Sequence, residues 1–487
     1  MCPDICFWKE WKIMNKTIDF FKEICAIPHG SYNIDAISDY LVKFAKDRNL
    51  NVVRDDVKNV VITKPASKGF EDRPGVILQG HMDMVAVKED GCDKDLLKEG
   101  LDLEEKDGYL YAIGTSLGGD DGIAVAMALS ILDDDSLEHP FLRCIFTVNE
   151  EVGMDGANAI DLSDVPEKYL INADSEEEGV VTISCAGGVC LSSNLKLKRE
   201  LPLYGNLYRI EISGLKGGHS GTMIHYHRAN ACILLGGLLS ELLKAGKVNL
   251  LEIGGGEKDN AIPKSAEMTL ATDMDEELFE KTIVEYDKYI CDKYSGTEDN
   301  IAVKVTPLTY DKEDCKLIGD ETEIIAEILS SVPDGVVSMC EGADLVETSL
   351  NLGIMKSDES GLRLDFLIRS SVDSRKEELK KQVGTLLANK GCELALSGDY
   401  PGWKFNPNSK LTKIVSECFE DQYGYKPVVT GVHAGLECGI LISKKADLDC
   451  VSIGPNILNI HTYNEKLDLE SCERTYNLLI KVLQKID

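Results

Sequence analysis

Side chains that could bind metal ions or move protons recur directly after apolar segments of this chain. They are His81 and Asp83 in GHMDMV, Asp120 in SLGGDDG, Glu150 and Glu151 in TVNEEVG, Asp174 in NADSEE, and His461 in NIHTYNE. Two imidazoles and three of these carboxylates would suit a pair of divalent cations, with Zn²⁺ expected and Mn²⁺ or Co²⁺ as substitutes. Two cations on five protein ligands require a shared ligand. We expect Asp120 to bridge, because a Gly-rich turn lets its carboxylate approach both ions.

Each of these motifs alone also has an ordinary structural explanation. A histidine two residues from an aspartate is commonly a hydrogen-bonded pair, and adjacent glutamates commonly face solvent. An aspartate after a strand commonly caps a helix. The joint pattern favours a metal site, because all the candidates are expected at one edge of one sheet. Of two adjacent glutamates, one can bind a metal while its neighbour stays free.

Apolar segments that alternate with helical patterns predict the elements that carry these residues. Strand-like segments occupy residues 76–80, 141–148 and 169–173, and an amphipathic helix is expected over 122–134. Near-continuous apolar strands separated by helices indicate a parallel or mixed sheet that is covered on both faces. Sheets of this kind place their ligands at the carboxyl ends of the strands.

A change of pattern after residue 187 predicts an inserted domain. Residues 207–214, 228–246, 251–256 and 266–273 are expected as strand, helix, strand and strand, which is typical of an α+β domain with helices on one face of an antiparallel sheet. The first pattern returns after residue 397. We therefore expect an N-terminal extension over residues 1–14, a catalytic α/β domain over 15–187 and 398–487, and an inserted α+β domain over 188–397.

Composition limits the possible partners and the cellular compartment. Acidic residues number 84 and basic residues 52, for a formal net charge of −32. This excess argues against nucleic acid and anionic membranes as partners, since both would repel the chain. No apolar stretch approaches the length of about 20 residues that a spanning helix needs. The 16 scattered cysteines include no CxxC pair, which favours reduced thiols in a cytoplasm.

Together these motifs resemble the cocatalytic zinc peptidases of the aminoacylase and carboxypeptidase-G type. Within that superfamily, LGGDDGIAVAMALSIL, NEEVGMDGA, GLKGGHSG, NAIPKSAE, LIRSSVDS and HAGLECG resemble the aminoacyl-histidine (Xaa-His) dipeptidases. The resemblance spans residues 15–485 and keeps the family's order of motifs. It implies a mixed sheet flanked by helices, with the inserted domain acting as lid and dimerisation platform.

The resemblance also implies how two metal ions are shared. One ion would be held by His81, Asp120 and Asp174, and the other by Asp120, Glu151 and His461.

Further roles around the metals follow from the same resemblance. Asp83 would orient the His81 ring and fix its tautomer. Glu150 would be the general base that transfers a proton from water to the leaving amine. The peptide bond between Asp120 and Asp121 is expected to be cis. The family more usually has asparagine at position 121, and the extra carboxylate is expected outside the set of ligands.

Substrate contacts are implied for the inserted domain and for HAGLECG. His219 would reach a neighbouring subunit's active site and stabilise the oxyanion. Asn260 and Arg369 would bind the substrate's terminal carboxylate, and His433 and Glu437 would line the specificity pocket. Without the resemblance, His219 would be a turn histidine, Arg369 a sheet-edge charge, and Glu437 a carboxylate in the first turn of a helix.

The function expected from these residues is metal-dependent hydrolysis of small unblocked dipeptides of the Xaa-His type, by a cytoplasmic homodimer. A tripeptidase or an N-acyl amino acid amidohydrolase would keep the same metals, and an inactive binding protein would keep the fold. A non-metal hydrolase is disfavoured, since the chain has no GxSxG motif.

Overall fold

The computed structural model describes residues 16–309 and 316–487. The extension expected over residues 1–14 lies outside the described residues. Contacts divide the chain into two compact units. Unit 1 comprises Met1–Ser184, Asn406–Gly431 and Leu436–Asp487, and unit 2 comprises Cys185–Phe405 and Val432–Gly435. The domain limits expected from the sequence stay predictions, because compact units defined by contacts need not fold independently.

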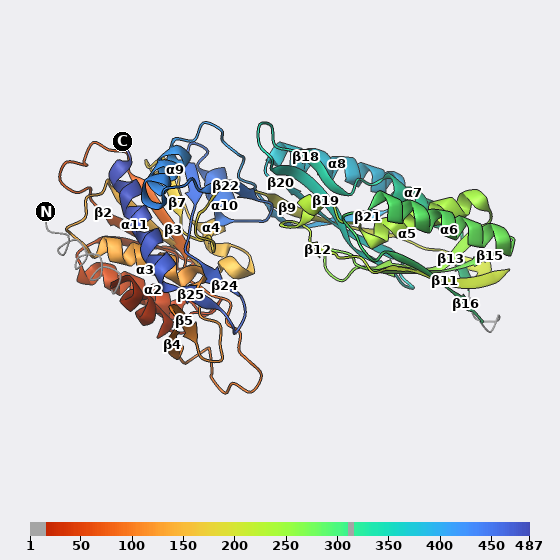
Figure 1. The fold of residues 1–487 in the computed structure, drawn as a ribbon, viewed down its shortest axis with the longest axis horizontal. Coiled ribbons are helices and arrows are strands. Elements are labelled where there is room, and N and C mark those ends of the chain that lie inside the picture. Colours follow the sequence, from red (N-terminus) through yellow and green to blue (C-terminus); the bar gives the residue numbers. More distant parts are fainter. Residues whose placement is uncertain (1–15, 310–315) are drawn as a thin grey trace. The chain divides into compact units, whose positions relative to one another are not determined.

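An eight-stranded mixed sheet forms the centre of unit 1 (Figure 1). Its strands in spatial order are β1 (Asn51–Arg54), β2 (Val60–Lys64), β6 (Leu142–Thr147), β3 (Val76–His81), β7 (Tyr169–Asn172), β23 (Asp449–Ser452), β8 (Val180–Cys185) and β22 (Val428–Val432). The four central strands β6, β3, β7 and β23 run parallel to one another. The strands expected from their apolar composition are confirmed, and their carboxyl ends share one edge.

Helices flank this sheet. They cover residues 16–25, α2 (Asp35–Asp47), α3 (Gly119–Leu132), α4 (Asp155–Ala159), α9 (Lys410–Tyr423), α10 (Glu437–Lys444) and α11 (Leu469–Lys485). The helix expected over 122–134 is confirmed, but its amphipathic character is wrong: every residue of α3 is buried, because the helix is apolar on nearly all sides. It packs on β3, and Thr17 donates a hydrogen bond to its Ser130. This packing fixes the start of α3, which carries Asp120.

A smaller four-stranded sheet completes unit 1 beside the loop of His461. Its strands are β24 (Ile457–Leu458), β25 (Lys466–Asp468), β5 (Tyr109–Ala112) and β4 (Leu103–Lys106). Because β24 and β25 pair antiparallel with each other, the segment between them forms a hairpin loop, which carries His461.

Unit 2 contains a nine-stranded sheet whose described pairings are all antiparallel. Its path runs β16 (Ala302–Leu308), β11 (Asn206–Ser213), β15 (Ala266–Thr272), β13 (Val248–Gly255), β19 (Val346–Ser357), β20 (Leu362–Ser370), β9 (Gly187–Leu195) and β21 (Glu393–Tyr400), and β18 (Gly335–Met339) pairs with β19.

Four helices cover one face of this sheet (Figure 1): α5 (Ala231–Ala245), α6 (Glu276–Lys293), α7 (Glu321–Ser331) and α8 (Asp373–Asn389). Their apolar side chains and those of the sheet form one continuous core. Two small sheets lie outside the main one: β10 (Arg199–Pro202) with β17 (Lys316–Ile318), and β12 (Gly218–His219) with β14 (Ala261–Ile262). The expected fold class, an α/β unit with an inserted α+β unit, is confirmed.

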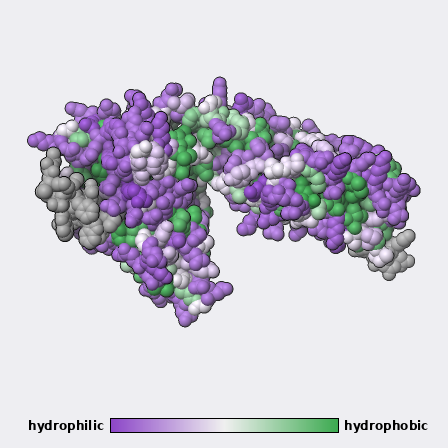
Figure 2. Space-filling model, in the orientation of Figure 1, coloured by the Kyte–Doolittle hydropathy of each residue, from purple (hydrophilic) through white to green (hydrophobic). Residues whose placement is uncertain are grey.

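No helix in the described part of the chain is both long and apolar enough to cross a membrane. Hydrophilic residues cover most of the face drawn in Figure 2. Most of the cysteines in the described residues are buried.

Candidate active site

The carboxyl ends of three adjacent parallel strands bring most of the predicted residues together. His81 is the last residue of β3 and pairs in register with Thr147 at the end of β6. Glu150 and Glu151 follow β6 in a short 3-10 helix, η1 (Glu150–Val152). Asp174 lies two residues beyond the end of β7. Parallel register alone therefore places one imidazole and three carboxylates at one edge of the sheet.

Asp120 enters this edge from the start of α3. The preceding Gly118 has φ 70°, in the left-handed region that favours glycine. The peptide bond between Asp120 and Asp121 is cis, as expected. The carboxylate of Glu465 accepts hydrogen bonds from the backbone N–H groups of residues 117, 118 and 119, at 2.9, 3.1 and 2.7 Å. Glu465 thus holds the turn that presents Asp120.

Two imidazoles face the two oxygens of Asp120. His81 Nε2 lies 3.0 Å from Asp120 Oδ1, and His461 Nε2 lies 3.1 Å from Asp120 Oδ2. His81 Nε2 also lies 3.5 Å from Asp174 Oδ1, and His461 Nε2 lies 3.1 Å from Glu151 Oε1. The five predicted ligands therefore form two groups that share Asp120, the arrangement that a bridging carboxylate requires.

Asp83 orients two neighbours through different atoms. Its backbone carbonyl accepts a hydrogen bond from His81 Nδ1 at 2.9 Å, whereas its carboxylate lies 3.7 Å from the same nitrogen. Because a carbonyl can only accept, the proton of the neutral His81 ring is on Nδ1 and Nε2 is free to bind a metal. The Asp83 carboxylate instead accepts from the Glu150 backbone N–H at 3.0 Å and from the Ser31 hydroxyl at 2.8 Å.

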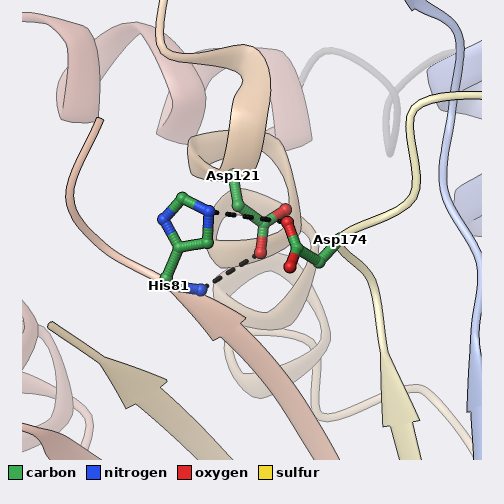
Figure 3. Close-up of side chains that lie close together, drawn as sticks. All are labelled: His81, Asp121 and Asp174. Carbon is green, nitrogen blue, oxygen red and sulfur yellow. Dashed lines mark hydrogen bonds and ion pairs between the residues drawn. The ribbon is translucent and has the colours of Figure 1, made fainter. Parts of the chain in front are cut away.

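Asp121 lies closer to the predicted ligands than expected. Its Oδ2 accepts a hydrogen bond from the His81 backbone N–H at 3.1 Å. Figure 3 shows the side chains of His81, Asp121 and Asp174 pointing toward one another, and one donor atom of each lies within 4.8 Å of the other two. Burial and the charge of Asp174 raise the pKa of Asp121 well above its ordinary value. This carboxyl group is therefore a further candidate for contact with a cation.

The crowding of carboxylates at this edge shifts their protonation. Burial, reinforced by neighbouring carboxylates, raises the pKa of Glu150 well above its ordinary value. Burial likewise raises the pKa of Asp174 to about 7. Burial also opposes ionisation of Asp120, but hydrogen bonds from His461 and His81 lower its pKa overall. Asp120 is therefore the more acidic of these groups, and Glu150 is more basic than an ordinary glutamate.

In unit 2, Arg369 is a buried cation that has no acidic partner among the residues the structure describes. It lies on β20, between β19 and β9, so the sheet-edge alternative is wrong. Its Nη1 donates to the Tyr400 hydroxyl at 2.9 Å, and its buried Nε has no hydrogen-bond partner within the described ranges. No carboxylate in residues 16–309 or 316–487 forms an ion pair with it. A buried guanidinium without an ion-pair partner favours the binding of an anion.

His433 lies near Arg369 and is held neutral. The Ser349 hydroxyl lies 2.8 Å from its Nε2. Burial and the charge of Arg369 lower the pKa of His433 to about 3. His433 therefore contributes a polar ring without adding a second positive charge.

In unit 2, His219 ends β12, and Asn260 directly precedes β14. β12 pairs with β14, and the Ser220 backbone N–H donates to the Asn260 carbonyl at 2.8 Å. His219 Nδ1 accepts from the backbone N–H groups of residues 221 and 222 at 3.2 and 3.0 Å. The proton of the neutral ring is therefore on Nε2, which is a donor. The Asn260 side chain is exposed.

Glu437 is fully buried at the first turn of α10. Gln79 Nε2 and the Thr147 hydroxyl donate to its Oε2 at 2.5 and 2.6 Å. Burial raises its pKa to about 7. Its predicted place in a specificity pocket remains untested, but its oxygens have no exposed surface in this conformation.

Sequence reasoning did not single out several residues that hold the predicted ones. They are Gln79, Thr147, Ser349, Tyr400 and Glu465. Gln79 lies within β3 and Thr147 ends β6, and the contrast of a buried polar residue with these largely apolar strands could have marked them. Glu465 lies in the same loop segment as His461, but nothing local indicates its distant partners.

The fold and this arrangement of residues are those of a peptidase family. Residues 77–485 match Peptidase family M20/M25/M40, and the chain belongs to that family. The resemblance noted in the sequence is thereby confirmed, and the chain is a peptidase.

Individual relatives resemble the chain over nearly its whole length. It is 36% identical to the cytosol non-specific dipeptidase of Escherichia coli strain K12 over 471 residues, 96% of this chain and 97% of that protein. The crystal structure of aminoacylhistidine dipeptidase from Vibrio alginolyticus matches with a TM-score of 0.93 and 32% identity, covering 97% of this chain and 96% of that one. Aminopeptidase PepT from Bacillus cereus shares the fold, with a TM-score of 0.55, 16% identity, and coverage of 97% and 98%.

Proposed function

We propose that this peptidase is a metal-dependent dipeptidase that cleaves small unblocked dipeptides, including those of the Xaa-His type. The main support is the position of Asp120, whose two oxygens face His81 and His461 at 3.0 and 3.1 Å. The dipeptidases from Escherichia coli and Vibrio alginolyticus, which resemble the chain over nearly its full length, support the choice of substrate. We further propose a cytoplasmic homodimer that associates through unit 2.

The donor set fits two divalent cations. His81, Asp120 and Asp174 would hold one, and Asp120, Glu151 and His461 the other, with Zn²⁺ favoured by the imidazole and carboxylate donors and Mn²⁺ or Co²⁺ as alternatives. His81 suits this role because its free Nε2 faces the carboxylates. Two such cations would polarise the scissile carbonyl and lower the pKa of the attacking water.

Glu150 would move the proton in this reaction. It takes a proton from the attacking water as the new C–O bond forms, and delivers it to the leaving nitrogen as the C–N bond breaks. The Asp83 carboxylate fixes the backbone of Glu150 through the 3.0 Å hydrogen bond. The raised pKa of Glu150 suits a group that must both accept and release a proton near neutral pH.

Residues of unit 2 would bind the substrate. Arg369, which lacks an acidic partner among the described residues, would pair with the terminal carboxylate, together with Asn260. His219 would donate from Nε2 to the oxyanion, in the site of the neighbouring subunit, because its Nδ1 already accepts two backbone hydrogen bonds. His433 would line the specificity pocket as a neutral ring.

A panel of metal-supplemented substrates tests this proposal. It should contain β-alanyl-histidine and Gly-His, with matched tripeptides and N-acetyl amino acids beside them. Dipeptides are expected to be cleaved fastest. Faster turnover of tripeptides or N-acetyl amino acids than of every dipeptide would overturn the substrate assignment.

Metal analysis of Glu150→Ala distinguishes an enzyme from an inactive binding protein. The variant is expected to hold as much metal as the wild type, because Glu150 is not among the proposed ligands. Its turnover should fall by at least about 100-fold through loss of the base. Absence of turnover in the wild type, with metal bound, would favour the inactive protein instead.

A further inference from the structure

Three buried polar residues occupy the ends of the central strands of unit 1, just before the proposed metal ligands. Gln79 on β3 precedes His81 by two positions, and Asn172 on β7 precedes Asp174 by two. Thr147 ends β6, directly ahead of the segment that carries Glu151. All three are buried in strands that are otherwise largely apolar. Buried polar groups are costly unless they are hydrogen-bonded, so their partners matter.

A single network joins these residues and ends on Glu437. Asn172 Nδ2 donates to Gln79 Oε1 at 2.8 Å, and Gln79 Nε2 donates to Glu437 Oε2 at 2.5 Å. The Thr147 hydroxyl donates to the same oxygen at 2.6 Å. The network therefore crosses β7, β3 and β6, the strands whose ends carry the proposed ligands, and Glu437 is the acceptor on which two of its branches meet.

The burial of Glu437 excludes a direct contact with substrate in this conformation. The side chain is 0% exposed, and its Oε1 is buried with no hydrogen-bond partner in the described part of the chain. Its position in the first turn of α10 lets the helix dipole offset part of the cost of a buried carboxylate. An ammonium group of a substrate could reach these oxygens only if they first became exposed.

We infer that Glu437 is a positioning residue, which ties the ends of β6, β3 and β7 together and so sets the spacing of Glu151, His81 and Asp174. This inference rests on the proposed metal-dependent function and replaces the expectation that Glu437 contacts the substrate. Residues hydrogen-bonded to metal ligands typically change metal affinity by about 10–100-fold when they are removed, and we expect a support that acts through the strands to act in the same direction.

Two substitutions at position 437 separate a positioning role from binding of the substrate's amine. In Glu437→Gln, the side-chain oxygen can take the position of Oε2 and accept from both Gln79 and Thr147. The NH₂ group then takes the position of Oε1, which has no partner among the described residues. Glu437→Met has a similar volume and no acceptor. Positioning requires the acceptor, whereas pairing with an ammonium group requires the negative charge.

The measurements are Zn²⁺ affinity of the metal-free protein, by isothermal titration calorimetry, and kcat and KM for Gly-His and β-alanyl-histidine. Glu437→Met is expected to weaken Zn²⁺ binding by about 10–100-fold and to lower kcat for both dipeptides by a common factor. Glu437→Gln is expected to stay within about threefold of the wild type in both measurements. A rise in KM in both variants, with unchanged Zn²⁺ affinity, would overturn the inference in favour of amine binding.

Glu167→Met is the matched control. Glu167 is also a buried glutamate of unit 1, 2% exposed, but it pairs with Arg143 near the opposite ends of the strands. The control is expected to lose stability and to keep the Zn²⁺ affinity of the wild type. An equal loss of affinity in Glu167→Met and Glu437→Met would show a general effect of destabilisation and would overturn the inference.

Thr147→Val and Thr147→Ser extend the test should Glu437→Met fail to fold. Valine removes one donor to Glu437 at nearly constant volume, whereas serine keeps the hydroxyl. Weaker Zn²⁺ binding in Thr147→Val, with recovery in Thr147→Ser, supports the inference, and equal affinities in the two variants contradict it. If the wild type itself neither binds Zn²⁺ nor cleaves dipeptides, the proposed function fails, whatever the variants do.

Discussion

Replacing Glu465 should loosen the turn that presents Asp120 to both imidazoles. The Glu465 carboxylate is 3% exposed and accepts from three consecutive backbone N–H groups, those of residues 117–119. A buried donor that loses its acceptor costs about 1–3 kcal/mol. Three such donors give about 3–9 kcal/mol for Glu465→Ala. Because water can enter the space left by the side chain, we expect the lower part of that range, about 3–5 kcal/mol.

Glu465→Gln should have a smaller effect than Glu465→Ala. Oε2 accepts from the N–H groups of residues 117 and 118, and Oε1 from that of residue 119. A glutamine can place its oxygen in only one of these positions, so its amide group faces at least one backbone donor. The expected loss is about 1–3 kcal/mol, and the order of stability is wild type, then Glu465→Gln, then Glu465→Ala.

Urea unfolding and Zn²⁺ titration together test this reasoning. Both variants should bind Zn²⁺ more weakly than the wild type, in the same order as their stabilities, because the turn also positions Asp120. Glu298→Ala is the control: Glu298 of unit 2 accepts from the backbone N–H groups of Lys216 and Ala229 at 2.8 and 3.1 Å. It should lose stability but keep its Zn²⁺ affinity. Wild-type affinity in Glu465→Ala would refute the positioning role.

Three further substitutions test burial, packing and charge. Burial raises the pKa of Asp334 to about 7, so the folded state binds this proton more tightly than the unfolded state does, and the protein loses stability as the pH rises from 4 to 7. The free energy of unfolding in urea should therefore be higher for Asp334→Asn than for the wild type at pH 8.5, by up to about 4 kcal/mol. At pH 4 the difference should be much smaller. A Cβ on Gly80 would lie 2.5 Å from Asp121 Oδ2, so Gly80→Ala should cost about 1–3 kcal/mol in the same assay, and wild-type stability would contradict this. Arg369→Met should raise KM for Gly-His at least about tenfold while leaving Zn²⁺ affinity and stability undiminished, whereas an unchanged KM would remove Arg369 from the substrate site.

The parts of the site that follow from strand order could be predicted from the sequence. His81, the adjacent glutamates and Asp174 each follow a short apolar segment, and parallel strands bring such positions to one edge of a sheet. The position of Asp120 between the two imidazoles was predictable, because its Gly-rich turn lets the carboxylate approach both sides. These inferences need only two things: which segments form strands or helices, and at which end of each strand the residue lies. Local sequence patterns indicate both.

The supports beneath the site could not be predicted in this way. Glu437 and Gln79 are 358 positions apart, and Glu465 and Gly119 are 346 apart. A glutamate at the start of a helix is ordinarily explained by the helix dipole, and nothing local shows that its carboxylate points into the protein. Such residues are determined by tertiary packing, which brings together side chains from opposite ends of the chain.

The distribution of buried charge connects the two halves of the proposed mechanism. Unit 1 gathers Asp120, Asp121 and Asp174 around His81, with more carboxylate than its imidazoles can balance, so it favours cations. Unit 2 buries Arg369 without an acidic partner among the described residues, so it favours an anion. A buried charge is stable only when it is paired, and under the proposed function the missing partner in each unit would come from the reaction rather than from the chain. Divalent cations would supply one partner, and the free carboxylate of an unblocked peptide would supply the other.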